Sequence, residues 1–369
     1  MKKISTLTTQ FANNQGAILQ CYALQHFLSN VEGVECQVID YFPKGSEQSW
    51  KVLPHPNNLK MLLKNIYTLF NLEWVIGKKQ KSKVMRQFIK DYIVTTPKKY
   101  DRNAIVANPP KADYYICGSD QIWNFVIFDD MTYYFDFVDK VPGAKRIAYA
   151  ASLSDPWNEE QGKKVSSLLE KFSELTIREA AHVPLVQKYV PSKRVKWVCD
   201  PVFLLPTDEW DKIATDPNEI EPYILCYFLN IDSKAVEFVN KMKNLTGYKV
   251  INLVLSSREK FKSDKLVHAY TPKEFVGYIK HASFIITNSF HCSAFSSMYK
   301  KNFRFIPKSW ANERLVSLEE LFGYKVIMTQ EMINKFTVED MPLDYSKAGK
   351  MDDFIAQSKK YLLHSIDER

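Results

Sequence analysis

The sequence predicts an α/β protein of two consecutive domains that face each other across a cleft. Its 369 residues exceed what one hydrophobic core usually serves. The chain opens as strand, loop, helix and strand between residues 4 and 41, which is the unit of a doubly wound sheet. A polar segment with three prolines, 206–222, precedes a second alternation of strands and helices, so this segment is the expected linker.

The first domain is expected to cover residues 1–215. Short apolar, β-branched and aromatic runs predict strands at 4–8, 34–41, 113–117, 145–152, 175–178 and 195–199. Apolar residues one turn apart predict helices after Gly16 and at 159–172 and 179–189. A long basic stretch near 57–95 also has helical spacing. We expect it to be an insertion of two helices, packed on the sheet or over the cleft.

The second domain is expected to cover residues 216–369. Its predicted strands are 223–229, 250–255, 283–287 and 303–306, and its predicted helices include 233–245, 313–322 and 351–366. Thr271, Pro272 and Glu274 have the spacing of a capping box with proline at the first helical position, which predicts another helix start. The last helix is expected to pack back onto the first domain.

Polar residues follow several strands of the first domain. Because the carboxyl ends of parallel strands meet at one edge of a sheet, these residues are expected to line a ligand site. The residues are Ser119, Asp120, Ser152, Arg178, Glu179 and Asp200, with Asn14 in the loop after the first strand and Asn124 after Asp120. That first loop lacks the G-x-G-x-x-G fingerprint of dinucleotide-binding proteins.

The stretch from Ser283 to Lys301 predicts a buried strand, a turn and a helix. Asn288 and Ser289 in the turn are residues that cap helices, and helical spacing begins near His291. Such a junction presents unpaired backbone N–H groups and the positive end of a helix dipole to an anion. His291 is interpreted either as an ordinary packing residue or as part of a site.

The chain carries 50 Lys and Arg residues against 42 Asp and Glu, a net charge of +8. A solvated surface accounts for this modest excess, and an anionic substrate or a loose attraction to acidic membrane surfaces are the functional alternatives. No nucleic-acid-binding motif with interleaved aromatic residues is present, so we expect no nucleic-acid partner.

The six cysteines are scattered singly, without a C-x-x-C pair, which is typical of buried residues in a reducing compartment. There is no apolar signal-peptide core near the start and no apolar run of about 18 residues, so a cytoplasmic location is expected. The Asp129-Asp130 pair has no companion ligand at suitable spacing. We therefore expect neither a metal nor a cofactor.

Six motifs, in order along residues 10–325, resemble those of the polysaccharide pyruvyl transferase family. They are N-N-Q-G-A-I-L-Q-C-Y-A-L-Q (13–25), G-S-D-Q-I-W-N (118–124), Y-A-A-S-L-S (149–154), T-I-R-E (176–179), D-P-V-F-L-L (200–205) and T-N-S-F-H-C-S-A-F-S (287–296).

The resemblance implies two Rossmann-like lobes, as in GT-B glycosyltransferases, with the acceptor on the first and the donor on the second. It implies a transferase that moves a pyruvyl group from phosphoenolpyruvate to two sugar hydroxyls. The product would be a ketal on a cell-surface polysaccharide, such as an exopolysaccharide, or on its lipid-linked precursor. It also implies that Arg178 grips the donor and that His291 belongs to the site. Some members carry arginine two residues before this histidine, where this chain has Ser289.

The chemistry of phosphoenolpyruvate supports the same residues, because its carboxylate and phosphate need several positive partners. The expected donor contacts are Arg178, Lys301, Arg314 and the turn residues Asn288 and Ser289. Histidine suits acid/base work near neutral pH, so His291 is expected to be an acid/base group or a phosphate contact. Asn14, Ser119, Asp120 and Asn124 are the expected acceptor contacts, because sugars are bound by hydrogen-bonding side chains.

Two other functions remain open from the sequence. A glycosyltransferase using a nucleotide sugar could have the same two-lobed fold, because fold alone does not fix function. A non-catalytic relative is the second alternative, and Ser289 in place of arginine is the feature that favours it.

Overall fold

The structure is a computed structural model that describes residues 1–53, 55–255, 261–307 and 313–367, without the side chains of residues 47, 49, 64, 313–315 and 347. The chain divides into two compact units. Unit 1 comprises Met1–Glu47, Ile89–Leu205 and Gly349–Arg369, and unit 2 comprises Gln48–Phe88 and Pro206–Ala348. The sequence placed the boundary after residue 215 and assigned the stretch near 57–95 to the first domain. In the structure the boundary between the two units lies between Leu205 and Pro206, and residues 48–88 belong to unit 2.

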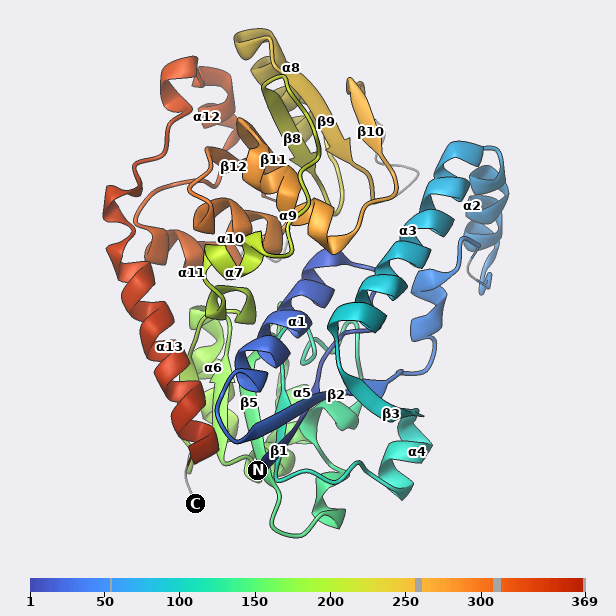
Figure 1. Ribbon diagram of the computed structural model, residues 1–369, viewed down its shortest axis with the longest axis vertical. Coiled ribbons are helices and arrows are strands. Elements are labelled where there is room, and N and C mark those ends of the chain that lie inside the picture. The colour runs from blue at the N-terminus through green and yellow to red at the C-terminus, as the bar shows by residue number, and fades with distance from the viewer. Residues whose placement is uncertain (54, 256–260, 308–312, 368–369) are drawn as a thin grey trace. The chain divides into compact units, whose positions relative to one another are not determined.

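Unit 1 is built on a seven-stranded sheet with the order β3-β2-β1-β4-β5-β6-β7. Its strands β1, β2, β3 and β5 are labelled in Figure 1. All neighbouring strands in it pair in parallel. Its strands are β1 (Lys2–Leu7), β2 (Val34–Tyr41), β3 (Thr95–Tyr100), β4 (Tyr114–Cys117), β5 (Lys145–Ala151), β6 (Glu174–Ile177) and β7 (Val195–Trp197). The strand order reverses between β1 and β4, and open α/β sheets bind ligands outside the carboxyl ends at such a point.

The helices of unit 1 include α1 (Gln15–Ser29), α4 (Arg102–Ala107), α5 (Glu159–Leu169), α6 (Val183–Tyr189) and α13 (Gly349–Asp367). The terminal helix α13 joins unit 1 through side chains on β7 and the residues after it. Phe354 lies 4.4 Å from Trp197 between ring centroids, and the Ser358 hydroxyl accepts a 3.0 Å hydrogen bond from the Cys199 N–H. The end of the chain is therefore part of the first α/β unit.

Unit 2 contains a five-stranded parallel sheet with the order β10-β9-β8-β11-β12. Its strands are β8 (Tyr223–Tyr227), β9 (Lys249–Leu253), β10 (Lys265–Val267), β11 (Phe284–Thr287) and β12 (Phe303–Phe305). Its helices include α7 (Thr207–Asp211), α8 (Ser233–Thr246), α9 (Pro272–His281), α10 (Phe290–Met298), α11 (Glu313–Phe322) and α12 (Gln330–Lys335). The order reverses between β8 and β11. The predicted capping box of Thr271 and Glu274 is confirmed at the start of α9.

Residues 48–88 add two helices to unit 2, α2 (Leu59–Leu69) and most of α3 (Leu72–Tyr92). Side chains of α3 pack on the segment after β10. The Lys81 ammonium lies 4.8 Å from the centre of the Tyr270 ring, and the His268 Nε2 lies 3.1 Å from the Glu73 carboxylate. Gly77 allows this approach, because a Cβ at its position would lie 2.2 Å from the His268 Cβ. No helix in the described ranges is long and apolar enough to span a bilayer.

Replacing Gly77 with alanine is expected to destabilise unit 2. The added methyl would have to displace the backbone-anchored Cβ of His268. Overpacking of this kind costs about 1–3 kcal/mol, which outweighs the helix propensity gained by alanine. Chemical unfolding should show the loss, and Gly349→Ala is the matched control because a Cβ there meets nothing within 4 Å. Equal stability of Gly77→Ala and the wild type would show that α3 does not depend on this contact.

Candidate functional site

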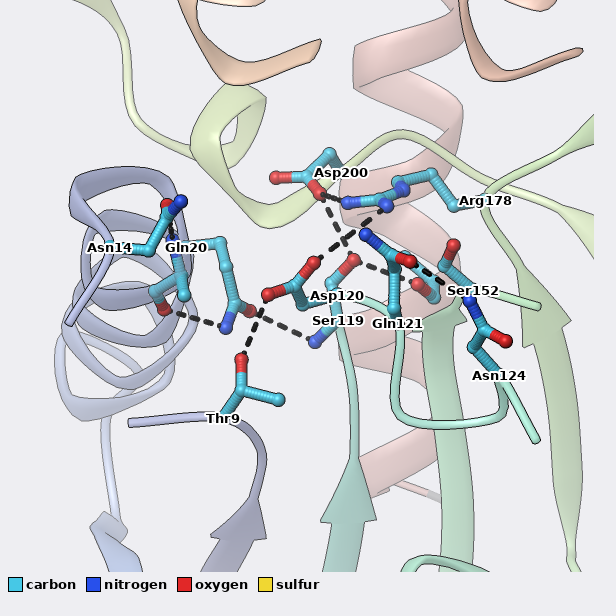
Figure 2. Close-up of polar contacts among 12 residues, drawn as sticks. Thr9, Asn14, Gln20, Ser119, Asp120, Gln121, Asn124, Ser152, Arg178 and Asp200 are labelled. Carbon is cyan, nitrogen blue, oxygen red and sulfur yellow. Dashed lines mark hydrogen bonds and ion pairs between the residues drawn. The ribbon is translucent and has the colours of Figure 1, made fainter. Parts of the chain in front are cut away.

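The polar residues expected at the sheet edge of unit 1 come together at the reversal between β1 and β4. The Thr9 hydroxyl, after β1, donates a 2.9 Å hydrogen bond to Asp120 Oδ2, after β4 (Figure 2). Gln20 of α1 accepts a 3.0 Å bond from the Ser119 N–H and donates a 2.7 Å bond to the Thr8 hydroxyl. The first helix thus fixes the loop that carries Ser119 and Asp120.

The backbone around this loop is crowded, and glycine is required at position 118. Gly118 has φ +124°, and a Cβ on it would lie 1.9 Å from the carbonyl oxygen of Tyr149. The next strand is irregular as well: the pairing of β5 with β6 shifts register between Ala148 and Ala151, with Ala150 at φ +52°. This bulge turns the Ala150 carbonyl towards the Ser119 hydroxyl, which donates to it at 2.8 Å.

Arg178 lies at the centre of a buried ionic cluster, which we call the Arg178 cluster and define as Arg178, Asp120, Glu179 and Asp200. The guanidinium donates a 2.7 Å hydrogen bond to Asp200 and lies 3.6 Å from Glu179 and 4.0 Å from Asp120. Only 1% of its side chain is exposed. Burial alone would lower the pKa of Arg178, but Asp200, Glu179 and Asp120 together raise it above its usual value. The arginine is therefore a permanent cation here.

Hydroxyl groups support the acids of the Arg178 cluster. The Ser119 hydroxyl, whose single proton is shared with the Ala150 carbonyl, lies 3.0 Å from the same oxygen of Asp200 that Arg178 contacts, and Ser152 donates to Glu179. Asp120 is the most accessible of the three carboxylates, with 17% of its side chain exposed, whereas Glu179 and Asp200 are fully buried. Asp120 is thus the acid of this cluster that can meet a ligand.

The other residues predicted in unit 1 have structural contacts. Asn14 caps α1, since its side chain accepts a 3.2 Å bond from the Ala17 N–H. Asn124 is 2% exposed, donates to Gln121 and Asp155, and accepts from the Val126 N–H. Asn124 therefore shapes the loop after Asp120. Thr9 and Gln20 are not among the predicted site residues, although Gln20 stands inside the motif at 13–25 that carries the family resemblance.

The second group of predicted residues lies in unit 2, at the reversal between β8 and β11. Asn288 joins the two strand ends, because its side chain accepts from the Leu229 N–H at 2.7 Å and donates to the Asn230 carbonyl. Ser289 caps α10 through a 3.4 Å bond from the Cys292 N–H. Both side chains form hydrogen bonds to backbone groups, and these bonds hold the start of α10 in place.

His291 stands in the first turn of α10. Its side chain is largely buried, with 8% of the residue exposed, and its ring meets the Phe290 ring edge-on at 5.3 Å. Lys301 follows the opposite, C-terminal end of this helix, directly before β12, and burial lowers the pKa of its ammonium. The helix start and His291 supply positive or protonatable groups, and Lys301 stands apart from them. The side chain of Arg314 lies outside the part of the chain that the structure describes.

Unit 1 also contains a cavity of about 1000 Å³ at the ends of β2 and β3, which we call the β2–β3 cavity. Aromatic and polar side chains line it together. The Tyr41 hydroxyl donates to Asp130, and the Phe42 and Phe128 rings both pack against Phe11. Its lining consists of residues 41–46, 101–103 and 127–131. None of the predicted site residues lines it. Among the described residues, no group of three or more His, Cys, Asp or Glu side chains could hold a metal ion.

Each unit therefore has a parallel sheet, a reversal of strand order and polar residues at that reversal, which is the arrangement of the Rossmann-like units in GT-B enzymes. Solved structures agree in fold. Staphylococcus aureus MnaA, in a co-structure with UDP, is 13% identical with a TM-score of 0.53, covering 100% of this chain and 99% of that chain. A proposed UDP-N-acetylglucosamine 2-epimerase from Listeria monocytogenes is 10% identical with a TM-score of 0.55, covering 99% and 95%.

The family model described as polysaccharide pyruvyl transferase matches residues 14–308. The chain belongs to this family, and the resemblance found in the motifs is confirmed. The family is a transferase family, and the GT-B-like fold expected from the resemblance is confirmed as well. No curated protein matches the sequence.

Proposed function

We propose that this protein transfers a pyruvyl group from phosphoenolpyruvate to two hydroxyls of a saccharide, forming a ketal and releasing phosphate. The observation that carries the proposal is the family match over residues 14–308. The acceptor would be a saccharide or a lipid-linked oligosaccharide of a cell-surface polysaccharide pathway, such as exopolysaccharide synthesis. Because phosphoenolpyruvate is a cytoplasmic metabolite, the proposal places the reaction in the cytoplasm.

The donor is assigned to the start of α10 in unit 2. Backbone N–H groups and the helix dipole at this end favour the phosphate or the carboxylate. Arg314 is the proposed cationic contact, whereas Lys301, which follows the opposite end of α10, is not assigned to the donor. His291 is the proposed acid/base group or phosphate contact, because it stands in the first turn of the same helix.

The reaction needs one proton at the donor and the loss of two protons from the acceptor. The methylene carbon of phosphoenolpyruvate takes up a proton and becomes a methyl group, while one sugar oxygen bonds to the adjacent carbon. A second sugar oxygen then bonds to that carbon, and the carbon–oxygen bond to phosphate breaks. Of the two hydroxyl protons, one replaces the proton that the acid gives to the methylene carbon, and the other leaves with phosphate as hydrogen phosphate. Asp120, the accessible carboxylate of the Arg178 cluster, is our candidate base on the acceptor side.

The acceptor is assigned to the sheet edge of unit 1. Asp120 at the reversal and the mixed aromatic and polar lining of the β2–β3 cavity suit a sugar, which presents hydroxyls along its rim and apolar C–H faces. We assign Asn14, Ser119 and Asn124 to shaping this edge. Arg178 would touch an anionic donor only after releasing Asp200, so we assign it to positioning Asp200 and Asp120.

Phosphoenolpyruvate is expected to raise the melting temperature of the full chain, whereas UDP-, GDP- and CMP-sugars are expected to leave it unchanged. Ligand at 100 times its Kd stabilises a protein by about 2.7 kcal/mol, which a thermal-shift assay detects easily. Phosphate release in the presence of an acceptor panel completes the test. Stabilisation by a nucleotide sugar alone would favour a glycosyltransferase. Absence of both a thermal shift and phosphate release with all donors and acceptors would favour a non-catalytic relative.

A further inference from the structure

The helix α2 presents its apolar side to solvent. Seven large apolar residues in and directly after it are 43–85% exposed. We call them the α2 apolar face: Leu59, Leu62, Leu63, Ile66, Tyr67, Leu69 and Phe70. At 100° per residue they fall within an arc of about 160°. They form one continuous stripe along the helix and its end.

The orientation of α2 is the reverse of that of an ordinary surface helix. Such a helix turns its apolar stripe towards the core and its polar residues towards water. Here Thr68, opposite the stripe, is only 3% exposed, whereas Leu63 is 57% exposed. A continuous patch of exposed apolar residues is typical of a surface that binds another protein or a membrane.

The start of α3, which follows α2 directly in the sequence, has two more exposed apolar residues and adds charge. Leu72 and Ile76 are 68% and 55% exposed. Lys79 and Lys83 follow at seven and eleven residues from Leu72, which places them along the same side of the helix, and both are exposed. Lysine side chains at the rim of an apolar face can reach headgroup depth while their stems stay among apolar groups.

The charged residues of the segment 48–88 are almost all positive. Residues 48–88 contain eight Lys and Arg residues and one acid, Glu73, a net charge of +7 out of +8 for the chain. The single acid is within 3.1 Å of His268. The excess of positive charge noted in the sequence is therefore concentrated in the segment that carries the α2 apolar face.

We propose that α2 and the first turns of α3 dock the protein on an anionic lipid bilayer, with the α2 apolar face at the boundary between headgroups and acyl chains. An amphipathic helix with lysines beside a large apolar face binds membranes in this way, and each Lys or Arg near an anionic surface adds to the attraction. A second copy of the chain fits this surface poorly, because pairing would bring two segments of charge +7 together. The inference does not depend on the proposed reaction.

Flotation of the full chain with vesicles tests the proposal. We expect binding to vesicles of phosphatidylcholine with phosphatidylglycerol, weaker binding to phosphatidylcholine alone, and weaker binding at high salt. Leu63→Glu combined with Ile66→Glu should lower binding to the anionic vesicles at least about tenfold. Ile220→Glu is the matched control, because Ile220 is 98% exposed in the same unit but far from α2 in sequence.

A second pair of variants tests the charge. Lys79→Glu with Lys83→Glu should lower anionic-vesicle binding at least about tenfold, whereas Lys111→Glu with Lys360→Glu, the same change of charge at exposed sites elsewhere, should have a small effect. Melting temperatures would show that all variants fold. Absence of wild-type binding to anionic vesicles, or equal losses in the test and control variants, would overturn the proposal. So would a wild-type dimer that Leu63→Glu with Ile66→Glu dissociates while vesicle binding is unchanged.

Discussion

His291→Ala is expected to lower kcat for phosphate release by a factor of about 10²–10⁴, the range that positioned acid/base groups contribute. The histidine stands in the first turn of α10, where backbone N–H groups favour the anionic donor, and it is held against Phe290 with little exposure. Steady-state phosphate release with saturating acceptor measures the effect.

The pattern of kinetic changes separates the two roles proposed for His291. An acid/base role predicts a fall in kcat with the phosphoenolpyruvate-induced thermal shift retained. A phosphate contact predicts a rise in KM for phosphoenolpyruvate and a smaller thermal shift. Ser289→Ala shows how much of the effect comes from a disturbed helix start, since it removes the cap of the same helix at a cost of about 0.5–2 kcal/mol in stability and leaves the imidazole in place. Unchanged turnover in His291→Ala would exclude the residue from the reaction.

Arg178→Met is expected to destabilise unit 1 by about 3–5 kcal/mol, because it leaves Asp200 and Glu179 buried without their cation. Urea unfolding measures the loss. Asp200→Asn should cost less, and the double variant should cost less than the sum of the two single variants, since each removes the same ion pair. Such non-additive costs are expected if Arg178 stabilises the fold through its 2.7 Å ion pair with Asp200.

The two interpretations of Arg178 give opposite results. If Arg178 grips the donor directly, Arg178→Lys should keep the unfolding free energy and lose the stabilisation by phosphoenolpyruvate. If it positions Asp200 and Asp120, Arg178→Lys should lower stability in the absence of ligand, because lysine cannot reproduce the planar guanidinium contacts. A stable Arg178→Lys protein that no longer responds to phosphoenolpyruvate would therefore contradict the positioning role.

Much of the fold could be predicted because its central strands are apolar, buried and bounded by polar residues. The predicted strands at 34–41, 113–117 and 283–287 match β2, β4 and β11 closely. The strands β3 and β10 were missed for physical reasons. The β3 sequence contains Pro97 and two lysines, and β10 is three residues long with no full burial. Edge strands of this kind lack the apolar signal of central ones.

The grouping of residues 48–88 with unit 2 could not be predicted from helical spacing alone. It depends on the contact of α3 with His268 and Tyr270, almost 200 residues later in the chain. Gly77 was the available signal, since a glycine inside a helical pattern often marks a close approach. The outward orientation of the α2 apolar face was equally hidden, because periodicity reveals that a helix has two faces but not which one is covered.

The sequence predicted where in the fold the candidate site lies. It did not predict which of its residues contact one another. The strand-end pattern located Ser119, Asp120, Arg178 and Asp200 at one sheet edge, where they do meet. The sequence could not show that Arg178 is already engaged by Asp200, because that contact depends on the relative positions of the ends of β6 and β7. The lining of the β2–β3 cavity comes from three separate segments and had no local signal.

The two edge strands of the unit 1 sheet, β3 and β7, are built in ways that disfavour aggregation through strand pairing. In β3, Pro97 cannot donate to a further strand, and Lys98 and Lys99 put charge on that border. The opposite strand, β7, is only three residues long, and α13 packs beside it through Phe354 on Trp197 and through Tyr361, whose ring lies 4.0 Å from the Lys196 ammonium. Neither border offers another chain a long template for strand addition. The final helix thus protects the sheet from intermolecular pairing, and a chain truncated before Gly349 would leave β7 open to it.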